Sequence, residues 1–171
     1  AWSQYFKEYG RAIDMFSHKE SYLKEDISNA RINVFDTILK YVPIYEKIEN
    51  ASPEVKAYEI MPIYSDKRSK WSIRADNIDE ITENINMLCD FPGEKFIMAY
   101  SDKPDEFLHK FGTNAEEVKD YILEVENKIE EMCNKLSNDT LLIISADHGH
   151  RDIEKVYSLL DYAEIQECLY M

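Results

Sequence analysis

Apolar residues recur at helical spacing in two segments of the chain. Residues 77–91 and 114–136 both place apolar side chains three and four positions apart, which is the spacing of one helix face. Asn77 and Asn114 stand at the expected N-cap positions, and each is followed three residues later by a glutamate. The pattern therefore predicts two amphipathic helices, and the regular stripe of the second indicates core packing.

Other apolar segments are typical of strands. Strands are expected over residues 11–16, 55–64 and 95–101. Pro62 should break or bend the second of them, because proline cannot donate to a sheet ladder. Residues 140–146 are apolar without alternation, which predicts a strand that is buried on both faces. The order strand, helix, strand makes residues 95–150 a βαβ unit with parallel strands and a right-handed connection.

Shorter patterns complete an α/β fold. Helices are expected over residues 2–8, 32–42, 153–160 and 162–170. The length of 171 residues suits one domain or a large piece of one. No apolar run approaches the length of a membrane span, so the sequence predicts no membrane segment in this chain.

The charge balance narrows the class of partner. The chain has 34 acidic against 20 basic residues and a net charge of −14, which argues against a nucleic-acid polymer as partner. Cys89, Cys133 and Cys168 are far apart and odd in number, so they indicate reduced thiols rather than a disulfide framework or a zinc finger. A cytoplasmic location is the expectation. Export is the alternative, because the chain begins at Ala1 and not at methionine.

Acids and histidines follow two of the predicted strands. Asp105 and His109 come after residues 95–101, and Asp147 and His148 come directly after residues 140–146. The carboxyl ends of parallel strands meet at one edge of a sheet, which is where α/β proteins bind ligands. Aspartate and histidine are ligands for zinc, and manganese or iron uses them too.

The spacing of these residues is compatible with metal binding. Asp105 and His109 would share one face if their segment makes a helical turn. Gly149 makes it easy for the chain to leave the extended form after His148. His150 is a weaker candidate, for a substrate contact or for a plain surface position. The alternative for the whole set is a series of ordinary hydrogen-bonded turns.

Residues 95–150 resemble the nucleotide pyrophosphatase/phosphodiesterase branch of the alkaline phosphatase superfamily. The resemblance is carried by a proline-aspartate pair, a histidine four residues on, an aromatic residue with glycine, and an apolar segment ending in Asp-His-Gly. In this sequence these are Pro104, Asp105, His109, Phe111, Gly112, Asp147, His148 and Gly149. Leu108 departs from the pattern, because the branch usually has glycine before the histidine.

The resemblance implies a fold and a metal content. The fold would be part of an alkaline phosphatase-like three-layer α/β/α domain with a mostly parallel sheet, with residues 1–171 as a single partial domain and residues 17–75 as a possible cap. Two divalent metal ions are implied, usually zinc, with manganese as the alternative. Asp105 and His109 would hold one ion, which a later histidine completes, and Asp147 and His148 would hold the other.

The resemblance also implies a hydrolase that cleaves phosphodiester or pyrophosphate bonds in a small phosphorylated substrate such as a nucleotide. Its threonine nucleophile and last histidine ligand are expected outside this chain, so the isolated piece is expected to be inactive. The rival within the superfamily is a cofactor-independent phosphomutase. The rival outside it is a non-catalytic α/β binding or interaction domain.

Overall fold

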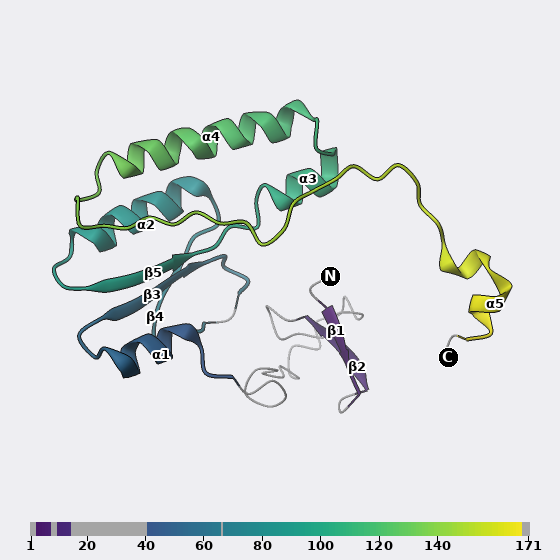
Figure 1. The fold of residues 1–171 in the computed structure, drawn as a ribbon, viewed down its shortest axis with the longest axis horizontal. Coiled ribbons are helices and arrows are strands. Elements are labelled where there is room, and N and C mark those ends of the chain that lie inside the picture. The colour runs from purple at the N-terminus through teal and green to yellow at the C-terminus, as the bar shows by residue number, and fades with distance from the viewer. Residues whose placement is uncertain (1–2, 8–9, 15–40, 66, 169–171) are drawn as a thin grey trace. The chain divides into compact units, whose positions relative to one another are not determined.

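The structure is a computed structural model that describes residues 3–7, 10–14, 41–65 and 67–168 (Figure 1). Its strands are β1 (Ser3–Phe6), β2 (Arg11–Asp14), β3 (Lys56–Met61), β4 (Trp71–Arg74) and β5 (Lys95–Ala99). Its helices are α1 (Ile44–Ala51), α2 (Ile78–Asp90), α3 (Asp105–Phe111), α4 (Glu116–Cys133) and α5 (Ala163–Gln166), with a 3-10 turn, η2, at Leu159–Asp161. The chain divides into two compact units, residues 1–102 with 124–141 and residues 103–123 with 142–171.

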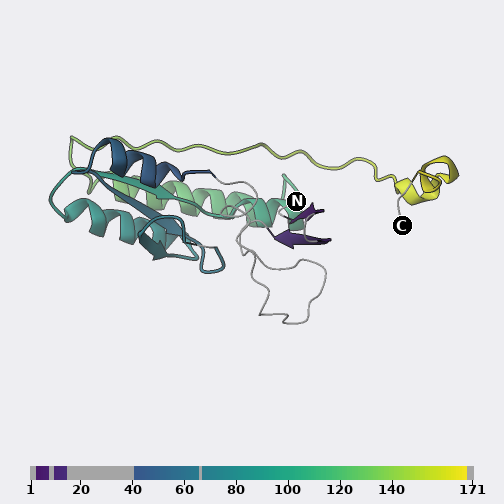
Figure 2. The ribbon, with the colours of Figure 1, turned by 90° about the horizontal axis from the view of Figure 1, so that it is seen from below.

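A three-stranded parallel sheet organises the first unit. β3 is the middle strand, with β4 and β5 on its two sides. Because successive residues of a strand point to opposite faces, β3 presents Tyr58 and Ile60 on one face and Ala57 and Glu59 on the other. Figures 1 and 2 show α2 over one face of the sheet and α1 over the other. The expected α/β fold with a parallel sheet between helical layers is confirmed.

The face beneath α2 carries the main apolar core. The fully or nearly buried cluster consists of Ile60, Ala75, Ile81 and Leu88. The helix begins where the sequence predicts, because the side chain of Asn77 accepts a hydrogen bond from the backbone N–H of Glu80 at 2.9 Å. The carboxylate of Glu80 accepts from the N–H of Asp76 and not from Asn77, so the cap is shifted by one residue from the standard capping box.

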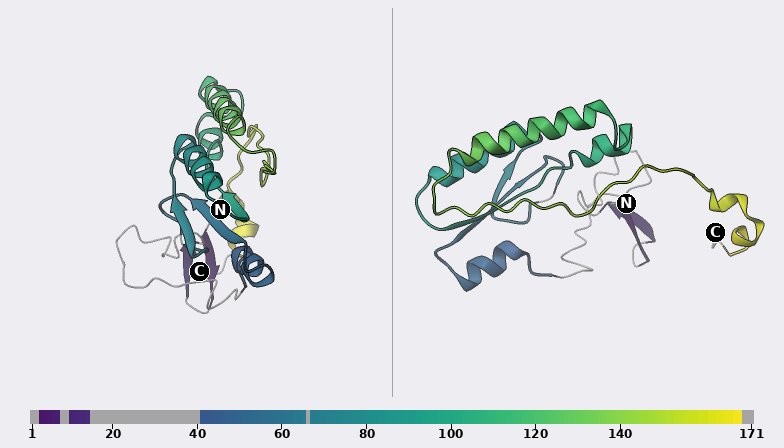
Figure 3. Two further views of the ribbon diagram at one scale, coloured as in Figure 1. Left: turned by 90° about the vertical axis from the view of Figure 1, so that its left-hand side faces the viewer. Right: turned by 45° about the horizontal axis from the view of Figure 1, so that its top comes forward.

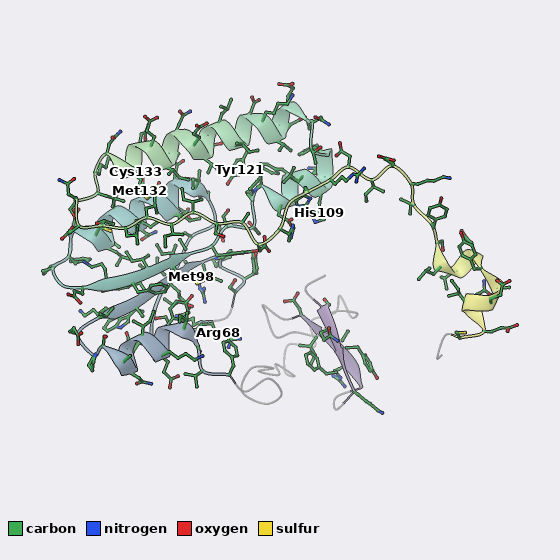
Figure 4. The ribbon with its side chains drawn as sticks, viewed as in Figure 1. Arg68, Met98, His109, Tyr121, Met132 and Cys133 are labelled. Atoms are coloured by element: carbon green, nitrogen blue, oxygen red, sulfur yellow. The ribbon has the colours of Figure 1, made fainter. Side chains whose placement is uncertain are left out.

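The opposite face holds a buried carboxylate. Glu59 is 0% exposed, and its Oε1 accepts a hydrogen bond from the backbone N–H of Arg68 at 2.7 Å. Tyr45 of α1 packs on the same face and donates its hydroxyl to Sδ of Met98 at 3.3 Å; Figure 4 labels Met98 and Arg68 on this side of the sheet. Burial, and next the Glu59 carboxylate, raise the pKa of Tyr45 above its usual range.

The long helix α4 begins at Glu116 and buries Val118 and Met132 of the predicted stripe, whereas Ile122 is 48% exposed and Tyr121 is buried instead. Asn114 is not its cap, since Ala115 stands directly before the first helical residue; the side-chain amide of Asn114 donates to Asp152. Within the first unit, Nζ of Lys128 lies 2.6 Å from Oδ1 of Asp79 on α2, and Figure 3 shows this half of α4 beside α2. Met132 is buried near the end of the same helix. The ion pair and the buried methionine fix this part of α4 to the rest of the first unit.

The helix predicted over residues 2–8 is wrong. Residues Ser3–Phe6 form β1 and pair antiparallel with β2. Gly10, at φ +63°, donates its N–H to the carbonyl of Lys7 and closes the turn between them. Pairing with a neighbouring strand therefore overrides the local pattern, as it often does for short segments.

The strand predicted over residues 140–146 is also wrong, and with it the second strand of the βαβ unit proposed for residues 95–150. Residues 140–158, all of which the structure describes, contain no strand. Leu141 is 84% exposed and Ile143 is 77% exposed, whereas the prediction required burial on both faces. An apolar run becomes a strand only where a neighbour completes its ladder, and the run alone does not reveal the neighbour.

The remaining predictions have mixed outcomes. Residues 153–158 are not helical, and the described part of the tail, up to residue 168, contains only η2 and α5. The helix expected over residues 32–42 falls mostly on residues outside those described. Residues 17–40 of the possible cap at residues 17–75 lie outside those described; within the rest of it, β3 and β4 belong to the three-stranded sheet. Within the described ranges, no helix has both the length and the apolar character that crossing a bilayer requires.

Candidate metal centre

The second unit brings an acid and a histidine together on α3. Asp105 opens this seven-residue helix, and His109 lies four residues later on the same face (Figure 4). Oδ2 of Asp105 lies 3.6 Å from Nε2 of His109. The helical turn on which the predicted pairing depended is therefore present.

His150 is the closest histidine to Asp105. Its Nε2 donates to Oδ1 of Asp105 at 2.6 Å, and its ring lies edge-on to the ring of His109 with centroids 4.9 Å apart. One ligand atom from each of Asp105, His109 and His150 lies within 4.8 Å of the other two. We call these residues the DHH cluster. All of them belong to the second unit.

His148 and Asp147 lie beside the DHH cluster. Nε2 of His148 is 3.7 Å from Oδ1 of Asp105 and also 3.7 Å from Oδ2 of Asp147. The rings of His148 and His150 have centroids 5.1 Å apart. The two pairs predicted from the sequence thus converge on Asp105. Asp147 is linked to the convergence through His148.

The position of His150 had a signal in the sequence. In an extended segment, residues two apart lie on one face, so His148 and His150 can both turn toward the same partner. Residues 147–150 form no helix, which preserves this spacing. This two-residue spacing of the histidines is the signal in the sequence that points to His150.

The DHH cluster fits a divalent transition metal. Imidazole nitrogen and carboxylate oxygen bind zinc at about 2.0–2.2 Å, and two such ligands in a tetrahedral arrangement are about 3.3 Å apart. The 3.6 Å separation of Asp105 and His109 is close to that value. Nε2 of His150 and Oδ1 of Asp105 are 2.6 Å apart. Their separation would have to increase by roughly 1 Å or less for the two atoms to ligate one ion.

The cluster has a covered end and an open end. The side chain of His150 is 16% exposed, whereas that of His109 is 71% exposed. Catalytic metal sites keep a position open for water or substrate, and structural sites close it with protein ligands. The exposure of His109 favours an accessible site.

A second acid, Asp152, connects the two segments that form the cluster. Its Oδ1 accepts from the backbone N–H of Thr113 at 2.7 Å, and its Oδ2 accepts from the hydroxyl of Thr113 at 2.9 Å and from Nδ2 of Asn114 at 3.2 Å. The hydrogen bonds to Thr113, and then the one to Asn114, hold the pKa of Asp152 below its usual value. The residues after His150 are thereby tied to the loop that follows α3.

Gly112 makes the approach of Asp152 possible. It ends α3 at φ 86° and ψ 169°, a backbone region that only glycine occupies without strain. A Cβ at this position would lie 3.2 Å from Oδ1 of Asp152.

The Gly112→Ala substitution is expected to lower the free energy of unfolding by about 1–3 kcal/mol, because it imposes backbone strain and crowds Asp152. Urea unfolding followed by circular dichroism measures the loss. Gly149→Ala is the matched control, because an added Cβ there meets no atom within 4 Å and its φ is not positive. Equal stability of the two variants would contradict the role of Gly112.

The family comparison covers almost the whole chain. A model of the family described as type I phosphodiesterase / nucleotide pyrophosphatase matches residues 2–170. No curated protein and no solved structure matches the chain significantly.

Proposed function

Because the chain belongs to the type I phosphodiesterase / nucleotide pyrophosphatase family, we propose that it provides metal ligands to a hydrolase of phosphodiester or pyrophosphate bonds. The observation that carries the proposal is the convergence of Asp105, His109 and His150 within 4.8 Å of one another. Its substrate would be a small phosphorylated molecule such as a nucleotide.

The proposal includes two divalent ions, zinc in the first place and manganese as the alternative. Asp105 and His109 would bind one ion, and Asp147 and His148 would bind the other. Paired ions of this kind stabilise the attacking and leaving oxygens of a phosphoryl group. The chain's own part is to hold the carboxylates and imidazoles in place and to leave the side of His109 open to substrate.

The nucleophile is proposed to come from a longer parent protein. The hydroxyl of Thr113 donates to Asp152, and the hydroxyl of Thr82 donates to the carbonyl oxygens of Ile78 and Asp79. Neither hydroxyl is hydrogen-bonded to a residue of the DHH cluster. We therefore expect the 171-residue chain to bind metal and to have no hydrolase activity by itself.

The test is release of p-nitrophenolate from bis(p-nitrophenyl) phosphate and from the p-nitrophenyl ester of thymidine 5′-phosphate. The parent protein should hydrolyse at least one of them with zinc or manganese, lose the activity with a chelator, and lose about 10²-fold or more in kcat in the Asp147→Ala variant. The 171-residue chain should show none.

Two outcomes would overturn the proposal. Isomerisation of a phosphorylated sugar or acid without ester hydrolysis would indicate a phosphomutase. Metal binding by the parent protein with neither reaction would indicate a binding domain. Full activity of the Asp147→Ala variant would remove that residue from the site.

A reducing, cytoplasmic location is part of the proposal. The thiols of Cys89, Cys133 and Cys168 are free, which supports a compartment in which disulfides do not form.

A further inference from the structure

We propose that the outer edge of β4 is a docking site for an extended, acidic segment of another protein, which adds to the sheet as a further strand. The site lies in the first unit, shares no residue with the DHH cluster and does not depend on the proposed function. Three features of this edge carry the inference: outward main-chain groups, a run of basic side chains and an exposed tryptophan.

β4 turns hydrogen-bonding groups away from the sheet. Among the described residues it pairs with β3 alone, and Figure 1 shows it at one edge of the three strands. The N–H of Ala75 donates to the carbonyl of Met61 on β3 at 3.1 Å. Because the main-chain groups of successive residues in a strand point to alternate sides, Ile73 also faces β3, whereas Ser72 and Arg74 face outward. These outward groups are the template that a further strand needs.

The edge is basic in an acidic protein. Residues 67–74 hold two lysines, two arginines and no acid, whereas the whole chain has a net charge of −14. Glu49 of α1 offsets part of this positive charge, since its Oε2 lies 2.6 Å from Nζ of Lys70. The charge that remains along the edge favours a negatively charged partner and disfavours a positive one.

The alternation along β4 specifies the pattern of the partner. Ser72 and Arg74 lie on one face of the strand, and Trp71 and Ile73 lie on the other. Lys70, directly before the strand, pairs with α1, which covers the face of Arg74. Side chains that lie opposite each other on paired strands share a face, where opposite charges and aromatic–β-branched pairs are stabilising. The fitting segment therefore alternates acidic and apolar residues.

Trp71 is an anchor that is already held in place. It is 39% exposed, and its Nε1 donates to Oε1 of Glu49 at 2.9 Å. Nζ of Lys56 and Nζ of Lys70 lie 5.2 Å and 6.0 Å from the centre of its ring, and the ring of Tyr58 lies 6.0 Å away. A side chain fixed in this way loses little freedom on binding, and tryptophan is prominent among the residues that dominate interfaces.

Basic side chains at a sheet edge also have a second use, which is to prevent pairing with another copy of the same edge. That use requires no exposed tryptophan, because a large apolar surface favours contact. Trp71 therefore distinguishes a docking site from an edge that is only protected. Nucleic acid is another polyanion that a basic edge attracts, but the net charge of −14 opposes it.

The test uses the 171-residue chain and a fluorescein-labelled eight-residue peptide in which glutamate and valine alternate, with binding followed by fluorescence anisotropy. Two further peptides carry N-methyl groups, one on every glutamate amide and the other on every valine amide. The two have equal charge, and each lacks the N–H groups on one side of the strand. Strand addition predicts that only one of them loses binding, by about tenfold or more. Loss with the methylated glutamates indicates antiparallel addition, and loss with the methylated valines indicates parallel addition.

Variants of the chain test the side chains of the edge. Trp71→Ala and Arg74→Glu should each weaken binding of the unmethylated peptide by about tenfold or more. Lys135→Glu is the matched control, because it also reverses a positive charge, at an exposed position outside β4. Its affinity should stay within about twofold of the parent value. Circular dichroism checks that each variant folds, and the methylated peptides test the inference without any variant.

Other results would overturn the inference. No binding of the unmethylated peptide, or equal binding of the two methylated peptides, would exclude strand addition. Equal weakening by Arg74→Glu and Lys135→Glu would mean that the charge of the whole chain, and not the edge of β4, attracts the peptide. Parental affinity in Trp71→Ala would remove the anchor. Binding of a labelled oligothymidylate without binding of the peptide would indicate a nucleic-acid partner instead.

Discussion

Replacing Asp105 with asparagine is expected to weaken Zn²⁺ binding by more than about 100-fold, because the substitution removes the charged ligand at the centre of the cluster. The two carboxylate oxygens of Asp105 face His109, His148 and His150 at 2.6–3.7 Å. An asparagine keeps the size of the side chain but replaces one of these oxygens with an amide nitrogen, which does not ligate zinc. Calorimetric titration of the chain with Zn²⁺ measures the change.

The matched control is Glu106→Gln, the same loss of charge at the next residue of α3, where the side chain is exposed. Its affinity for Zn²⁺ should stay within about twofold of the parent value, since screened surface charges contribute little. Equal weakening in the two variants would mean that general charge near α3, and not ligation by Asp105, controls binding.

Replacing Glu59 with alanine is expected to lower the free energy of unfolding by about 2–4 kcal/mol, which is a large part of the stability of a small domain. The carboxylate is 0% exposed and accepts the backbone N–H of Arg68 at 2.7 Å. Alanine would leave that N–H without its acceptor and a cavity between β3 and α1. Guanidinium unfolding followed by circular dichroism measures the loss.

Two comparisons make the Glu59 result specific. Glu94→Ala, at an exposed position before β5, should change the stability by less than about 0.5 kcal/mol. Glu59→Gln keeps an acceptor for the N–H of Arg68 and should fall between the two. A Glu59→Ala variant as stable as Glu94→Ala would show that the buried carboxylate contributes nothing to the sheet domain.

The parts of the fold that the sequence predicted are those with a local cause. Asn77 begins α2 because its side chain can accept an N–H three residues away, and both partners are visible in the sequence. Pro62 marks the end of β3, and a change to polar residues marks the end of β5. The segment at residues 140–146 has the composition of a strand, but a strand needs a partner that composition does not name.

In the candidate site, too, the sequence predicts what has a local cause and misses what depends on distant residues. Asp105 and His109 were predicted because four residues make one helical turn, which needs only their spacing. His150 was undervalued because its hydrogen bond to Asp105 joins positions 45 residues apart, and no local spacing indicates such a contact. Buried Glu59 was missed for a related reason: the hydrogen bond to its Oε1 comes from a backbone N–H, which no pattern of side chains indicates.

The separation of the ligands along the chain has a thermodynamic consequence. Asp105 and His150 are 45 residues apart, so an ion bound by both acts as a reversible cross-link that closes a long loop. Closing such a loop restricts the unfolded chain, and binding to the folded form adds stability that rises with the logarithm of the free ion concentration. The unit that contains α3 would then become more resistant to unfolding and proteolysis as the cation becomes more abundant. Cation supply would set the lifetime of this part of the protein as well as any activity it supports.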